Sequence, residues 1–109
     1  MQISELKEKL NLELINELHE HEITGVFLSD MVSDIISGAK AGNLLVTVQI
    51  HKNLIAAANL VDVSGIIITQ GKKPDDEVKE MADRTKIPLF SVTENGWEVA
   101  KKLIAMGIS

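Results

Sequence analysis

Short runs rich in β-branched and other apolar residues recur along the chain and predict its strands. Each run is bounded by Gly, Ser, Asn or Pro, which is typical of strands that end in tight turns. The run at 65–69 (GIIIT) is apolar almost throughout, as expected for a strand buried on both faces of a parallel sheet. The predicted strands span residues 23–28, 44–50, 65–69 and 88–92.

Apolar positions at three- and four-residue spacing follow each predicted strand, and this period predicts amphipathic helices. The first runs from 30 to 40, the second from 52 to 61, the third from 74 to 85, and the last from about 94 to 107. In the second, Leu54, Ile55, Ala58 and Val61 form one apolar stripe.

Residues at the predicted helix starts have types that favour those positions. Ser29 or Asp30 is expected to cap the first helix, and Thr93 the last, because their side chains accept hydrogen bonds from free N–H groups. Pro74 suits the first turn of the third helix. Trp97 is expected to pack into the core as part of an apolar staple across the start of the last helix.

The order strand–helix, repeated four times, predicts a mostly parallel sheet joined by right-handed crossovers. A short helix at 5–10 precedes these units, and residues 12–16 are expected to add a short edge strand. The sequence therefore predicts an α/β fold, a single domain over residues 1–109 with helices flanking the sheet.

Composition narrows the classes of function. The chain has 109 residues, with 11 Lys and Arg against 16 Asp and Glu, a formal charge of −5. An acidic domain does not attract phosphate backbones, so no nucleic-acid partner is expected. The absence of Cys excludes disulfides, thiolate catalysis and iron–sulfur clusters. No apolar run approaches the length of a membrane helix. We expect a soluble cytoplasmic domain with no membrane partner.

Polar side chains cluster where the predicted strands end, which is where open α/β sheets bind ligands. One interpretation is that these residues only cap helices, and the other is that they line a small-molecule pocket. Alternation along 44–50 predicts that Thr47 and Gln49 face the same side of the sheet. The candidate ligand-binding residues are Ser29, Asp30, Thr47, Gln49, His51, Asn53 and Thr69.

Motifs for catalysis, cofactors and metals are weak. The chain has neither the glycine-rich phosphate loop nor the dinucleotide fingerprint. His51 with Ser29 and Asp30 has the residue types of a triad, but no nucleophile elbow is present. His19 and His21 are spaced to face one way along a strand, yet a stable zinc site needs three or four ligands. We expect no catalytic residue, no metal and no cofactor.

Several linked segments resemble the DRTGG domain family. They are GVFLSDMVSD (25–34), GNLLVTVQIHKN (42–53), VSGIIITQG (63–71), and the pairs Pro74-Asp75 and Ile87-Pro88. The resemblance implies an α/β module that dimerises or regulates, as in CBS-domain pyrophosphatases and some phosphate acetyltransferases. It also extends to the N-terminal domain of HPr kinase/phosphorylase, whose phosphate loop has no counterpart here. Because residues 83–85 (DRT) are followed by Lys-Ile and not by two glycines, no site residue is carried over.

Two hypotheses of function remain open. The first is a non-catalytic regulatory or assembly module that forms a homodimer, with the exposed apolar positions of the helix at 30–40 in the interface. The alternative is a sensor of an anionic metabolite or nucleotide, or an unrecognised enzyme, that uses the polar rim at the strand ends. Thr47 and Gln49 converging on one volume would favour the alternative, and a rim engaged in helix caps would favour the module.

Overall fold

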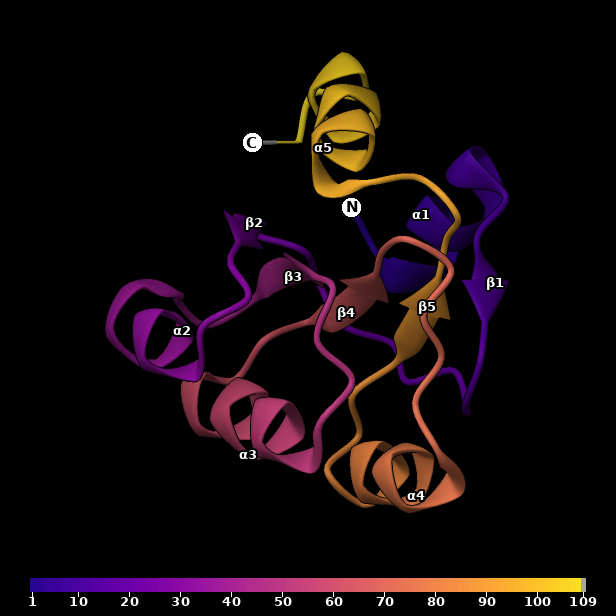
Figure 1. The fold of residues 1–109 in the computed structure, drawn as a ribbon. Helices are drawn as coiled ribbons and strands as arrows, with labels where there is room; N and C mark the ends of the chain where they lie inside the picture. Colours follow the sequence, from indigo (N-terminus) through magenta and orange to yellow (C-terminus); the bar gives the residue numbers. More distant parts are fainter. Residues whose placement is uncertain (109) are drawn as a thin grey trace.

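The predicted strands lie side by side in one five-stranded sheet, seen in the computed structural model of residues 1–108 (Figure 1). Its strand order is β1-β5-β4-β3-β2. The strands are β1 (Glu13–Leu14), β2 (Gly25–Leu28), β3 (Asn43–Thr47), β4 (Gly65–Ile68) and β5 (Leu89–Ser91). The helices are α1 (Ile3–Leu10), α2 (Val32–Gly38), α3 (Lys52–Val61), α4 (Asp76–Arg84) and α5 (Gly96–Ala105).

Strands β2 to β5 are parallel, as the strand–helix order predicts. The short strand β1 is the exception, because it pairs antiparallel with β5, Glu13 opposite Ser91 and Leu14 opposite Phe90. The expected edge strand from residues 12–16 is therefore confirmed.

Helices cover both faces of the sheet. Because β2, β3, β4 and β5 follow one another in a single direction, right-handed crossovers place α2, α3 and α4 on one face. Helices α1 and α5 lie on the other face (Figure 1). No helix within residues 1–108 has the length and apolar character needed to cross a bilayer.

Strand side chains alternate between two apolar cores. The core under α2, α3 and α4 includes Leu45, Ile66, Ile68 and Leu89 together with the buried stripe of α3. The core under α1 and α5 takes the neighbouring positions of the same strands and is centred on Phe90, which is fully buried. Its other strand residues are Leu44, Val46 and Ile67.

Strand β3 ends at Thr47, three residues earlier than predicted. The Asp30 side chain causes this, since its Oδ1 accepts hydrogen bonds from the Thr47 hydroxyl (3.0 Å) and the Val48 amide (2.9 Å). Gln49 consequently lies in an exposed loop while Thr47 is buried. The prediction that both face one side of a strand is wrong.

Three predicted helix starts are also displaced. The residue before α2 is Met31, which has no side-chain cap, so neither Ser29 nor Asp30 caps that helix. Asp75 caps α4 through the amide of Val78, and Pro74 lies outside the helix.

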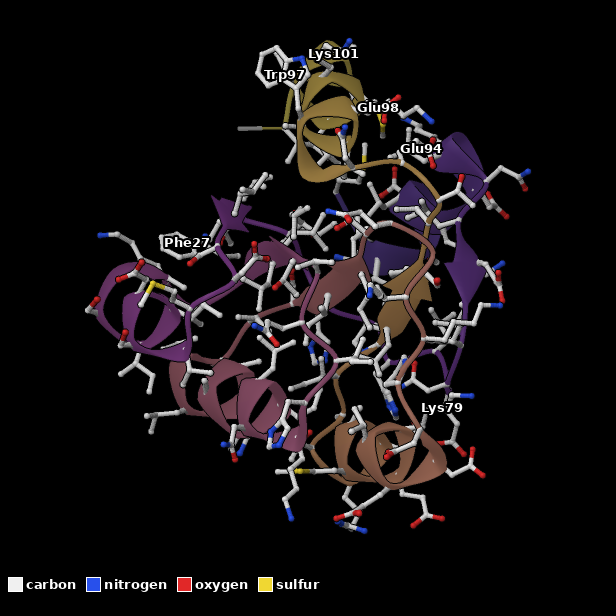
Figure 2. All side chains as sticks on the ribbon, in the orientation of Figure 1. Phe27, Lys79, Glu94, Trp97, Glu98 and Lys101 are labelled. Atoms are coloured by element: carbon white, nitrogen blue, oxygen red, sulfur yellow. The ribbon has the colours of Figure 1, made fainter. Side chains whose placement is uncertain are left out.

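The start of α5 differs from prediction as well. Asn95 and Glu98 form a reciprocal capping box, and Thr93 is not the cap. This shift of two residues places Val99 in the core. Trp97 turns outward and is 67% exposed, so the expectation of a core tryptophan is wrong. Figure 2 shows it on the outer side of α5, where the Lys101 ammonium lies 5.9 Å from the ring centroid.

Candidate functional site

The carboxyl ends of the parallel strands form a polar rim, and buried hydroxyl groups hold its centre together. Thr47 donates to Asp30 and also accepts from the Gln49 amide at 3.2 Å. Thr69 donates to the Thr47 carbonyl at 3.4 Å. Thr47 and Thr69 are each 2% exposed, and both have partners, as buried polar groups require.

A small hollow lies beside these threonines. It has a volume of about 180 Å³ and is lined by the ends of β2, β3 and β4 and the first residue of α5, Gly96. A methyl group at Gly96 would lie 3.3 Å from Leu28 Cδ1, so the helix start and the end of β2 touch closely. Asp30, Thr47 and Thr69 line this hollow.

A larger cleft of about 600 Å³ opens further along the rim. One wall is the β3–α3 loop with Gln49 and His51, and the other is the segment that leads into α4. The His51 Nδ1 atom accepts from the Asn53 amide at 3.1 Å and caps α3. Nδ1 therefore carries no proton in this arrangement, and Nε2 is the donor that His51 offers.

Charges in this cleft balance. Two lysines and two carboxylates line it: Lys52, Lys73, Asp75 and Glu77. Lys52 lies 3.6 Å from Glu77, and Lys73 lies 3.0 Å from Glu13 on β1. These pairs are more than half exposed, so each contributes little to stability. An anionic ligand in the cleft would compete with both carboxylates for the lysines.

Another carboxylate at the rim follows β5. A hydrogen bond from the Lys102 ammonium lowers the pKa of the Glu94 carboxyl below its usual value. The Glu94 carbonyl accepts from the Gln70 amide at 2.8 Å. This residue therefore ties α5 to the loop after β4.

The seven residues proposed from the sequence thus fall into separate places. Asp30, Thr47 and Thr69 surround the small hollow, whereas Gln49 and His51 line the larger cleft. Ser29 accepts from the Met31 amide at 3.2 Å and lines neither space. Asn53 lies on α3 and faces the groove toward α2.

Sequence analysis missed most of the second wall of the cleft. Pro74, Asp75 and Glu77 come from a segment more than 20 residues after Gln49, and their types suggested only a helix start. Lys73 beside that helix start was the one local signal.

His19 and His21 make different contacts. His19 Nε2 lies 3.1 Å from Asp83 Oδ1, and His21 Nε2 lies 2.7 Å from the Lys86 carbonyl. Within residues 1–108, the group whose ligand atoms come within 4.8 Å of one another is Glu17, His19 and Asp83, without His21. Asp83 Oδ1 is engaged there by hydrogen bonds from Asn16 and the Glu17 amide as well, so this cluster has a structural role.

Comparison with known proteins covers nearly the whole chain. Residues 5–106 match the protein family described as the DRTGG domain. Phosphate acetyltransferase from Haemophilus influenzae is 26% identical over 110 residues, and the match covers 91% of this chain but 16% of the enzyme. The Escherichia coli enzyme is 27% identical over 105 residues, covering 86% of this chain and 15% of the enzyme. The chain therefore spans about one sixth of these relatives.

The regulatory region of Clostridium perfringens pyrophosphatase has a similar structure. That structure contains CBS and DRTGG domains and is complexed with the activator diadenosine tetraphosphate. The TM-score is 0.70 at 17% identity, and the match covers 91% of this chain and 44% of that one. The likeness confirms the predicted α/β fold.

Proposed function

Because the chain belongs to the DRTGG domain family, we propose that it is a non-catalytic regulatory module that works as a homodimer. The observation that carries this proposal is the match over residues 5–106, together with the place of the same kind of domain in the regulatory region of a pyrophosphatase. The proposed role is to transmit a state to a partner or to a second copy, and not to carry out a reaction.

The chemistry of the described residues supports a non-catalytic role. Nucleophilic catalysis needs a hydroxyl or thiol hydrogen-bonded to a base. Within residues 1–108, the three histidines contact a carboxylate, a carbonyl and a backbone amide, and none contacts a hydroxyl. The chain has no Cys. The rim hydroxyls at Ser29 and Thr47 are engaged in turns and strand ends.

The homodimer predicts a molar mass of twice 11.9 kDa. We expect light scattering coupled to size-exclusion chromatography to give this mass at micromolar concentration. The physical reason is the exposed apolar surface of the chain, which includes eight large side chains in residues 1–108. A constant mass of 11.9 kDa up to about 100 µM, where weak dimers of this range would form, would refute the homodimer.

The cleft favours a second candidate function, a sensor for an anionic metabolite or nucleotide. Its volume of about 600 Å³ falls within the range of small-molecule sites. Its lysines, the His51 Nε2 donor and the start of α4 can all meet phosphate oxygens. The pyrophosphatase region is complexed with a dinucleotide polyphosphate, although it holds CBS domains besides its DRTGG domain.

Diadenosine tetraphosphate is the probe for this second function. Under it, the melting temperature should rise with the dinucleotide, because a ligand at 100 times its Kd stabilises a fold by roughly 2.7 kcal/mol. Lys73→Ala should remove the rise. Lys101→Ala, which lies on the opposite side of the sheet on α5, should keep it. An unchanged melting temperature of the wild type at millimolar dinucleotide would refute binding of this ligand.

A further inference from the structure

A shallow apolar groove runs between α2 and α3 on the side of these helices that faces away from the sheet. Its volume is about 310 Å³. Ile36 on α2 and Leu60 on α3 project beside it and are 45% and 69% exposed. We call this surface the α2–α3 groove. It is lined by Val32, Ile36, Asn53, Ala56, Ala57 and Leu60.

The α2–α3 groove lacks the charges that cover other helices of this chain. After Lys52, the exposed positions of α3 are Asn53, Ala56, Asn59 and Leu60, and none carries a charge. The exposed positions of α4 are Asp76, Glu77, Glu80 and Arg84. Charge depletion combined with exposed apolar side chains distinguishes the core of a protein interface from solvated surface.

The apolar surface extends beyond the groove toward the end of β2. Leu28 and Met31 are 52% and 60% exposed and lie at the entrance to α2. With Ile36 and Leu60, their exposed parts amount to roughly 400 Å², about half of the roughly 800 Å² that each partner contributes to a standard interface. The uncharged polar residues around the groove can supply the remainder as a rim.

We infer that the α2–α3 groove is the surface by which two copies of this chain associate, with α2 and α3 of one protomer packed on those of its partner around a two-fold axis. This inference rests on the homodimer proposed above. In a two-fold contact the same patch must supply both the projecting and the receiving part. Here Leu60 and Ile36 project, and the small side chains of Ala56 and Ala57 leave room to receive them.

Electrostatics favour a second copy as the occupant. Each chain carries a net charge of −5, so two copies repel unless they meet where carboxylates are sparse. Asp34 is the only carboxylate within α2 and α3, whereas α4 alone holds four in its nine residues: Asp76, Glu77, Glu80 and Asp83. A face almost free of acidic groups is the one that two acidic chains can share.

The first experiment compares Leu60→Asp and Ile36→Asp with the matched control Ile104→Asp. Ile104 is 62% exposed on α5, across the sheet from the groove. We expect the two groove variants to raise the dimer Kd at least 100-fold and to elute as 11.9 kDa chains, while the control stays dimeric. Circular dichroism verifies that all three fold, which their exposed positions favour.

The second experiment uses the single tryptophan. Trp97 is exposed on α5 and lies on the other side of the sheet from α2 and α3 (Figure 2). Its emission maximum should therefore stay constant when the dimer is diluted through its Kd. A red shift on dilution would place the contact on α5 and overturn the inference.

The outcomes separate the surface from the homodimer itself. A wild-type chain that is monomeric refutes the homodimer and the surface with it. A dimeric wild type whose Leu60→Asp and Ile36→Asp variants remain dimeric refutes the surface alone. A partner of another kind would leave the chain monomeric in isolation and would equally overturn the inference.

Discussion

Replacing Phe90 by alanine is expected to lower the free energy of unfolding by about 3–5 kcal/mol, the usual cost of removing a buried aromatic side chain. Phe90 is fully buried in the centre of β5, beneath α1 and α5. Its neighbours are held by two helices on one side and by the hydrogen-bonded sheet on the other, so the cavity cannot collapse easily. Urea denaturation followed by circular dichroism measures the loss.

Phe27→Ala is the matched control, since these are the two phenylalanines of the chain. Phe27 is half-buried on the edge strand β2 and covers Gly38 at the end of α2, where an added methyl group would lie 2.8 Å from its ring. We expect a smaller loss for it, about 1–2 kcal/mol, because solvent already reaches the side chain. Equal losses for the two variants would show that the core under α1 and α5 repacks freely.

The elements that the sequence predicted best are those whose signals are local. The strand at 65–69 is a run of apolar residues, and β4 occupies 65–68 with every residue buried. The stripe of Leu54, Ile55 and Ala58 marks α3, and all three are buried. Periodicity over a few residues carries this information, so the order of strands and helices follows from the sequence.

Helix starts and strand ends were predicted less well, because distant residues decide them. Asp30 is next to a predicted helix and is a good cap by type, yet it bonds to Thr47, which is 17 residues away in the chain. That bond leaves α2 without a side-chain cap and ends β3 early. Asn95 in place of Thr93 at the start of α5 likewise turned Trp97 from the core to the surface.

The candidate site shows the same division. The sequence identified the carboxyl edge of the sheet as the place where polar groups gather, which is a property of the topology. It did not separate the small hollow at Thr47 and Thr69 from the cleft at Gln49 and His51, because their walls come from different loops. The α2–α3 groove was anticipated only as the exposed apolar positions of residues 30–40.

One residue with no sequence signal holds three segments together. Asn16 follows the short strand β1, and its Nδ2 group donates to Asp83 Oδ1 and to the Ile87 carbonyl, each at 2.8 Å. Its Oδ1 atom accepts from the Leu89 amide at 2.7 Å. A lone asparagine between a strand and a polar loop is typical of a turn, so the sequence gives no hint that it joins β1 to α4 and β5.

Asn16→Ala should therefore lower the free energy of unfolding by about 2–4 kcal/mol, a large effect for a polar residue that is only half-buried. The substitution leaves the buried Leu89 amide and the Ile87 carbonyl without their partners, and each such orphaned group costs roughly 1–3 kcal/mol. Asn59→Ala, on the exposed surface of α3, is the matched control and should stay within about 0.5 kcal/mol. Chemical denaturation of both variants at one protein concentration measures the difference. A loss for Asn16→Ala no greater than that of the control would mean that water replaces all three hydrogen bonds, and that β1 is held by its pairing with β5 alone.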